Sequence, residues 1–141
     1  MTMTKTVLTF ATLALAVASA FAFGAQAATD EQKQMAYQSI ERNAAEIATV
    51  SDALYYYAEP GMQEFESVKM LKEQLESIGF KVETGRAGMP TALWATWGSG
   101  KPHIAIVTEI DALPEGSQTP GSMPRKPLVS GAPGHMEGHN V

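Results

Sequence analysis

Apolar side chains recur every three or four positions in residues 31–58 and again in residues 64–78. In the first stretch these positions are Ile40, Ala44, Ile47, Val50, Leu54 and Tyr57. In the second they are Phe65, Val68, Leu71, Leu75 and Ile78. This spacing places each set on one face of an α-helix. The sequence predicts two consecutive helices, the first with Asp30 as N-cap and the second ending at Gly79.

After Gly79 the period changes to that of β-strands. Residues 80–83 alternate between apolar and charged side chains, and residues 91–97 carry both tryptophans. Residues 104–110 form a nearly continuous apolar run, which is typical of a central strand buried on both faces. The Gly- and Pro-containing connection over residues 98–102 predicts a hairpin before it. The fold class expected is therefore α/β: two N-terminal helices, then strands of a mixed sheet.

The N-terminal stretch has the features of an export signal. Lys5 precedes an apolar, Ala-rich run over residues 7–23, and small residues stand at Ala25 and Ala27. This pattern predicts a signal peptide over residues 1–27, cleaved before Ala28, and hence a periplasmic or extracellular protein. The alternative is an uncleaved anchor, but an Ala-rich run favours the membrane weakly, so no stable membrane anchor is expected.

Composition excludes several classes of function. The 141 residues include 10 Lys and Arg against 15 Asp and Glu, a formal net charge of −5. The basic residues are scattered, which argues against a nucleic-acid partner. The chain has no cysteine, so disulfide scaffolds, thiolate metal sites and cysteine nucleophiles are excluded.

The C-terminal segment concentrates the side chains that bind metals. His135, Glu137 and His139 are spaced by two, and neighbouring glycines disfavour a helix. In an extended backbone, residues two apart point to the same side, so two imidazoles and one carboxylate would lie together. Imidazole and carboxylate are common zinc ligands and also suit manganese. The alternative interpretation is a solvated polar tail.

A second candidate site follows the predicted strand over 104–110. Glu109 and Asp111 stand at its C-terminal end, where sites form in α/β sheets. Such acids can bind a metal, or orient a metal-bound histidine without touching the ion. His103 lies at the opposite end and is expected to be simply exposed. Arg125 and Lys126 lie in a loop over residues 112–134 that is rich in Pro and Gly, and solvated charges are the simpler interpretation.

Taken together, three segments resemble a known family. Residues 58–64 resemble the N-P-E-L-G-x-x-E segment, residues 109–114 the E/D-x-D-A-L-P segment, and residues 134–140 the G-H-x-C-G-H-D/N segment of the metal-dependent amidohydrolases. This is the aminoacylase and carboxypeptidase family, peptidase family M-twenty. Within it, the motifs resemble the aminobenzoyl-glutamate hydrolase branch. The match covers nearly all of residues 28–141.

The resemblance implies a phosphorylase/hydrolase-like metallopeptidase catalytic domain holding two divalent ions, Zn²⁺ or Mn²⁺. It places metal ligands at Glu137 and His139, and an acid beside the metal centre at Asp111. His135 matches a motif histidine that is not usually counted as a ligand. Glu137 stands where many family members have cysteine, and a carboxylate there favours harder ions.

The resemblance also implies the function. We expect an exported hydrolase of amide bonds in N-acyl or aminobenzoyl amino acids or dipeptides, acting on small-molecule amide or peptide substrates. Family members continue for a few hundred residues and supply a Glu-Glu pair and two more histidines, so residues 28–141 alone are expected to be an inactive N-terminal fragment. The full-length protein could form a homodimer. Two alternatives are a non-catalytic exported binding protein and a small metal-binding protein complete in itself.

Overall fold

The computed structural model describes residues 27–141. The predicted signal peptide lies outside the described residues, except for Ala27, and it stays a prediction. The described chain divides into two units between Arg42 and Asn43, a boundary that falls within helix α2 (Asp30–Tyr57). Across the part of the chain that the structure describes, no helix is both long enough and apolar enough to cross a membrane.

Helix α2 begins with a capping box rather than with the predicted Asp30 cap. The Thr29 hydroxyl accepts a hydrogen bond from the Gln32 amide at 3.2 Å, and the Gln32 side chain accepts one from the Thr29 amide at 2.9 Å. These two reciprocal bonds satisfy amides that have no partner within the helix. Asp30 is instead the first helical residue, where its negative charge favours the positive end of the helix dipole.

A turn over residues 58–64 leads into helix α3 (Phe65–Ser77), and Glu59 caps this helix. The Glu59 carboxylate accepts bonds from the Glu66 amide at 2.9 Å, the Ser67 amide at 2.9 Å and the Ser67 hydroxyl at 2.7 Å. At the other end Gly79 adopts a φ of +95°, and its amide donates to the Glu76 carbonyl at 3.0 Å. The predicted end of the helix at Gly79 is therefore confirmed.

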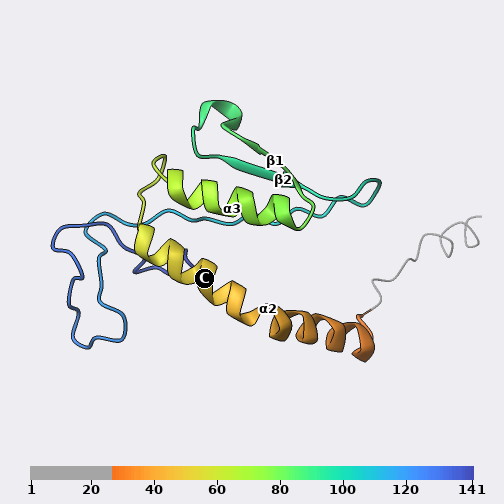
Figure 1. The fold of residues 1–141 in the computed structure, drawn as a ribbon, viewed down its shortest axis with the longest axis horizontal. Coiled ribbons are helices and arrows are strands. Elements are labelled where there is room, and N and C mark those ends of the chain that lie inside the picture. Colours follow the sequence, from red (N-terminus) through yellow and green to blue (C-terminus); the bar gives the residue numbers. More distant parts are fainter. Residues whose placement is uncertain (1–26) are drawn as a thin grey trace, which may run out of the picture. The chain divides into compact units, whose positions relative to one another are not determined.

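A β-hairpin follows α3. Strand β1 (Lys81–Thr84) pairs antiparallel with β2 (Leu93–Thr96), with Val82 opposite Ala95. The connection contains a short 3₁₀ turn, η1 (Arg86–Gly88). Helix α3 packs against this hairpin and runs alongside it in Figure 1. The buried Glu64 joins the two, because its carboxylate accepts a hydrogen bond from the Thr91 hydroxyl at the start of the second hairpin arm.

The prediction of a central strand over residues 104–110 is wrong, and so is the prediction of a hairpin before it. The segment forms no ladder in the described part of the chain, and it joins neither β1 nor β2. Ile104, Ile106 and Val107 are 87%, 86% and 90% exposed. The side chains do have the composition of a buried strand, but a strand also needs a partner for its backbone groups.

The α/β fold class is confirmed: among the described residues, two helices precede two antiparallel strands. The apolar core is small, since Leu54, Val68 and Ala112 are the buried hydrophobic residues of the described chain. Many positions of the predicted apolar faces remain exposed, among them Ile47 and Phe65 at 52% and 58%. The sheet is a purely antiparallel pair, so the predicted mixed sheet is not formed within residues 27–141.

Candidate metal centre

The backbone around Ala112 fixes the position of Asp111. The Ala112 amide donates to the Glu59 carbonyl at 2.8 Å, and Pro60 and Ala112 form an isolated parallel bridge. Ala112 is 2% exposed. Glu59 therefore contacts both helix α3 and the backbone at Ala112. Its side chain caps α3, and its carbonyl accepts the hydrogen bond from Ala112, the residue next to Asp111.

A second bridge brings the C-terminal segment to the same place. Leu113 and Gly134 exchange antiparallel hydrogen bonds of 3.1 and 3.0 Å. Gly134 also passes against Gly116 so closely that a Cβ atom on Gly134 would lie 2.4 Å from the Gly116 carbonyl oxygen. This contact closes the loop over residues 116–134 and sets the direction in which residues 135–140 leave it.

The loop over residues 116–134, which we call the proline loop, is tied together internally. The Ser117 amide donates to the Ala132 carbonyl at 3.1 Å, and the Ser117 hydroxyl accepts from the Val129 amide at 3.0 Å. Arg125 donates to the Glu115 carbonyl and, at 3.5 Å, to the Ser117 carbonyl. Arg125 is exposed, in agreement with the prediction of a solvated charge, and its guanidinium in addition braces the loop through these two carbonyls.

His139 lies between the two acids of the other motif. Its Nδ1 atom is 3.1 Å from the Asp111 carboxylate and 3.2 Å from the Asp111 carbonyl. Both of these oxygens are acceptors, so Nδ1 carries the proton. The Nε2 atom lies 3.1 Å from the Glu109 carboxylate. Asp111 thus fixes the ring from one side, and the other nitrogen faces a carboxylate.

Glu137 occupies the position between the two histidines, as its spacing predicts. Its Oε1 atom is 3.6 Å from Nδ1 of His135 and 3.6 Å from Nδ1 of His139. The Glu137 side chain is 19% exposed. At these distances it interacts by charge rather than by direct hydrogen bonds.

The electrostatics of this cluster favour a bound cation. Glu109, Asp111 and Glu137 all surround His139, and within residues 27–141 none of the three forms an ion pair with a lysine or arginine. Burial by itself lowers the pKa of His139. The hydrogen bonds to the side chain and backbone of Asp111 and the charges of Glu137 and Asp111 outweigh it, so the pKa lies above its ordinary value of 6.5.

The donor set fits one side of a metal site. With Nδ1 held by Asp111, Nε2 is the atom of His139 that can coordinate an ion, an arrangement common around protein-bound zinc. Glu109 lies nearest to that atom, whereas Glu137 faces Nδ1. Among the described residues, no three histidine or carboxylate side chains are arranged to hold a single ion.

The other candidate residues are also placed. The His135 side chain is 0% exposed, and neither of its ring nitrogens has a hydrogen-bond partner among the described residues. His103 is exposed, as predicted. Sequence reasoning gave Glu109 less weight than Asp111 and missed the capping role of Glu59, although both residues fall within the motif segments.

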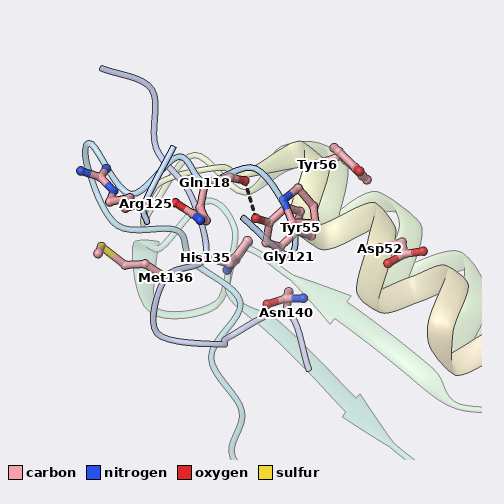
Figure 2. A pocket seen from close by; sticks show the side chains of 10 residues that line it. Asp52, Tyr55, Tyr56, Gln118, Gly121, Arg125, His135, Met136 and Asn140 are labelled. Carbon is pink, nitrogen blue, oxygen red and sulfur yellow. Dashed lines mark hydrogen bonds between the residues drawn. The ribbon is translucent and has the colours of Figure 1, made fainter. Parts of the chain in front are cut away.

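A cavity of about 580 Å³ lies beside the cluster, and His135 and Asn140 from the same segment contribute to its wall. Figure 2 shows His135 between Gln118 and Asn140, with Arg125 and Met136 on one side and Tyr55 on the other. The Tyr55 hydroxyl donates to the Gln118 carbonyl, which attaches the proline loop to helix α2. The cavity is therefore formed by α2, the proline loop and the C-terminal segment.

The chain is similar to a hydrolase among the known proteins. The chain is 35% identical over 103 residues to one of the subunits of p-aminobenzoyl-glutamate hydrolase from Escherichia coli (strain K12), a match that covers 73% of this chain and 21% of that protein. The match thus spans about a fifth of the relative's length and shows a distant relationship to a hydrolase. No family model matches the chain. No solved structure matches it either.

Proposed function

We propose that this chain forms one side of the metal site of an exported metal-dependent amidohydrolase. The bonds cleaved would be amides of N-acyl or aminobenzoyl amino acids or of dipeptides. The relative's name supports the hydrolysis of such bonds, and its greater length leaves room for the other ligands and the general base. The metal, the substrate, export and a homodimeric full-length protein are all part of the proposal.

The observation that carries it is the contact between His139 and Asp111. These residues lie 28 positions apart in two separate motifs, and the fold brings the Nδ1 atom and the carboxylate to 3.1 Å. A carboxylate in that position fixes the ring orientation and makes the imidazole a better ligand. A solvated polar tail, the competing interpretation, would not need such a partner.

In this proposal His139 would hold an ion through Nε2, the atom that Glu109 approaches. Glu137, which faces Nδ1 in this structure, is the second ligand that the motif resemblance implies, and the remaining ligands would come from the rest of the longer protein. Asp111 keeps the proton on Nδ1 and does not touch the ion. A divalent ion, when bound, lowers the pKa of water to about 7 and polarises an amide carbonyl. The excess of carboxylates over cations favours Zn²⁺ or Mn²⁺ over thiophilic ions.

The test is metal-dependent hydrolysis of p-aminobenzoyl-glutamate and N-acetyl amino acids. It is run with the full reading frame that contains this chain and, separately, with the 141-residue chain. We expect the full protein to lose turnover with EDTA and to regain it with Zn²⁺ or Mn²⁺, and the 141-residue chain to have none. His139→Ala should abolish turnover, and His103→Ala is the matched control because this histidine is exposed and outside the cluster.

Full activity of the EDTA-treated protein, or of His139→Ala, would overturn the proposal. A folded full-length protein that binds substrate without cleaving it would favour the alternative, a non-catalytic exported binding protein. Export is tested separately. The protein recovered from the periplasm or medium should begin at Ala28 by mass spectrometry, and retention of residues 1–27 would exclude the predicted cleavage.

A further inference from the structure

We propose that Ser51 of helix α2 is a positioning residue for the candidate metal site, and that it acts on His139 through the side chain of Asn140. In this proposal Ser51 touches neither an ion nor a substrate. The inference rests on the proposed metal site, and it adds to that site a helix that none of the three motif segments contains. Three features support it: a long-range hydrogen bond, the small number of other bonds that hold residues 135–141, and the place of Ser51 on its helix.

The first feature is a contact between two residues that lie 89 positions apart. The Asn140 side-chain amide donates a hydrogen bond to the Ser51 hydroxyl at 3.2 Å and a longer one to the Ser51 carbonyl at 3.5 Å. Both residues are half-buried, so water competes with this contact less than it would at the surface. Asn140 directly follows His139 in the chain, so a bond that fixes Asn140 also restricts the backbone of His139.

The second feature is how few bonds hold residues 135–141. Among the described residues, the backbone of this segment forms one backbone–backbone hydrogen bond, from the Val141 amide to the Gly138 carbonyl, and that bond lies within the segment. The hydrogen bonds from the segment to other parts of the fold come from two consecutive side chains. His139 meets Asp111, and Asn140 meets Ser51. Without the second bond, the backbone at His139 could pivot about the first.

The third feature is the place of Ser51 on helix α2. Ser51 stands four positions after Ile47 and three before Leu54, so it falls on the same helix face as these apolar side chains. Serine adds little to packing on such a face and is a weaker helix former than alanine or leucine. The bond from Asn140 gives its hydroxyl a partner there. Tyr55, one turn further along this face, bonds to the proline loop through its own hydroxyl. Helix α2 thus attaches both segments that border the site.

Small displacements of His139 matter because a metal ligand must be closely aligned. Functional sites require their side chains to be held within roughly 0.5 Å and 10–20° of the productive geometry. Asp111 orients the ring at Nδ1, whereas the bond from Asn140 to Ser51 restrains the backbone that carries the ring. Removing a residue that orients a metal ligand typically lowers metal affinity by roughly 10–100-fold.

The experiment measures Zn²⁺ affinity by isothermal titration calorimetry, with the protein translated from the full reading frame. Ser51→Ala and Asn140→Ala should each weaken binding about tenfold. The double variant should weaken it no further, because both substitutions remove the same bond. Ser51→Thr keeps a hydroxyl at this position and should restore affinity. Thr49→Ala is the matched control and should bind Zn²⁺ as the wild type does, because the Thr49 hydroxyl bonds within α2, to the Ala45 carbonyl at 2.9 Å.

Two further readouts separate positioning from stability. In the metal-free protein, hydrogen–deuterium exchange at residues 135–141 should rise in Ser51→Ala and stay at the wild-type level in Thr49→Ala. With Co²⁺ in place of Zn²⁺, the visible absorption bands report the geometry of the ligands. These bands should change in Ser51→Ala and match those of the wild type in Thr49→Ala.

The outcomes distinguish this inference from the proposed function. Wild-type Zn²⁺ affinity in Ser51→Ala, an equal loss in Thr49→Ala, additive losses in the double variant, or no rescue by Ser51→Thr would overturn the positioning role and leave the proposed metal site standing. A wild-type protein that does not bind Zn²⁺ would overturn the proposed metal site, and the positioning role would fall with it.

Discussion

A Cβ atom on Gly134 would lie 2.4 Å from the Gly116 carbonyl oxygen, and a Cβ atom on Gly116 would meet the Gly134 carbonyl oxygen at the same distance. The two backbones can approach this closely because neither residue has a side chain. The contact lies directly beside the Leu113–Gly134 bridge, which sets the path of the chain toward His135 and His139. It couples the geometry of the proline loop to that of the candidate metal site.

The first prediction concerns this contact. Gly134→Ala should lower the free energy of unfolding by at least about 1–3 kcal/mol, because two stretches of backbone must separate to admit the methyl group. The same variant should weaken Zn²⁺ binding, since residues 135–139 would shift. Urea unfolding followed by circular dichroism measures the first effect and calorimetry measures the second.

Gly61→Ala is the control for that experiment. A Cβ atom there would lie 3.7 Å from the Asp111 carboxylate, an ordinary contact, and the φ of Gly61 is not positive. This variant should therefore keep wild-type stability. A Gly134→Ala chain as stable as Gly61→Ala would show that the glycine contact does not constrain the fold.

The second prediction is a pH dependence. The pKa of His139 lies above 6.5 because the bonds to Asp111 and the nearby carboxylates outweigh the effect of burial. In the metal-free chain, His139 therefore stabilises the fold fully below pH 6.5, and this contribution is lost as the pH rises through its raised pKa. An NMR titration of the His139 imidazole should give a midpoint above 6.5.

Asp111→Asn is the matching variant, because it keeps the size of the side chain and removes its charge. The midpoint of His139 should move down, because the hydrogen bond and the charge of Asp111 both raise its pKa. Zn²⁺ binding requires the neutral imidazole, so binding by the wild-type chain should weaken as the pH falls through the raised pKa. An unchanged His139 midpoint in Asp111→Asn would show that this carboxylate does not control the ring.

The third prediction concerns Glu59. Its carboxylate accepts three hydrogen bonds at the start of α3. Glu59→Ala should cost about 1–2 kcal/mol of unfolding free energy, the usual range for losing a helix cap. Glu66→Ala, in the same first turn but with an exposed side chain, should cost much less. Equal losses in the two variants, measured by urea unfolding, would rule out the capping role.

The sequence predicts the parts of this fold that depend on local pattern. Both helices and the end of α3 at Gly79 follow from a period of three to four residues and from glycine's freedom to adopt a positive φ. The wrong prediction of a strand over residues 104–110 has a non-local cause. A strand is stabilised by pairing with a partner strand, and its own side chains do not specify that partner. The predicted cap of α2 is one position away from the observed Thr29 cap, because two capping residues stand side by side.

The candidate site likewise has features that the sequence predicts and features that it does not. The motifs identify His139, Glu137 and Asp111 by residue type and spacing, and the structure brings all three together. The approach of Glu109 to Nε2, the unpartnered ring of His135 and the bracing by Arg125 depend on how the proline loop closes. That closure is set by the contact of Gly116 with Gly134, which leaves no periodic signal in the sequence.

The last prediction follows from the exposed segment over residues 104–110. Its apolar side chains are solvent-exposed and its backbone forms no ladder among the described residues, which is the condition under which strands of different molecules pair. We expect the purified chain to associate with itself, and Val107→Lys to reduce this, because a charge on an unpaired strand opposes edge-to-edge pairing. Light scattering after size-exclusion chromatography measures the mass of each form. Thr108→Lys is the comparison variant. It adds the same charge at the next position, which faces the opposite side if the segment is extended. It therefore tests whether removal of the apolar Val107 side chain has an effect beyond that of the added charge. A wild-type chain that is monomeric at high concentration and melts cooperatively would contradict the expectation.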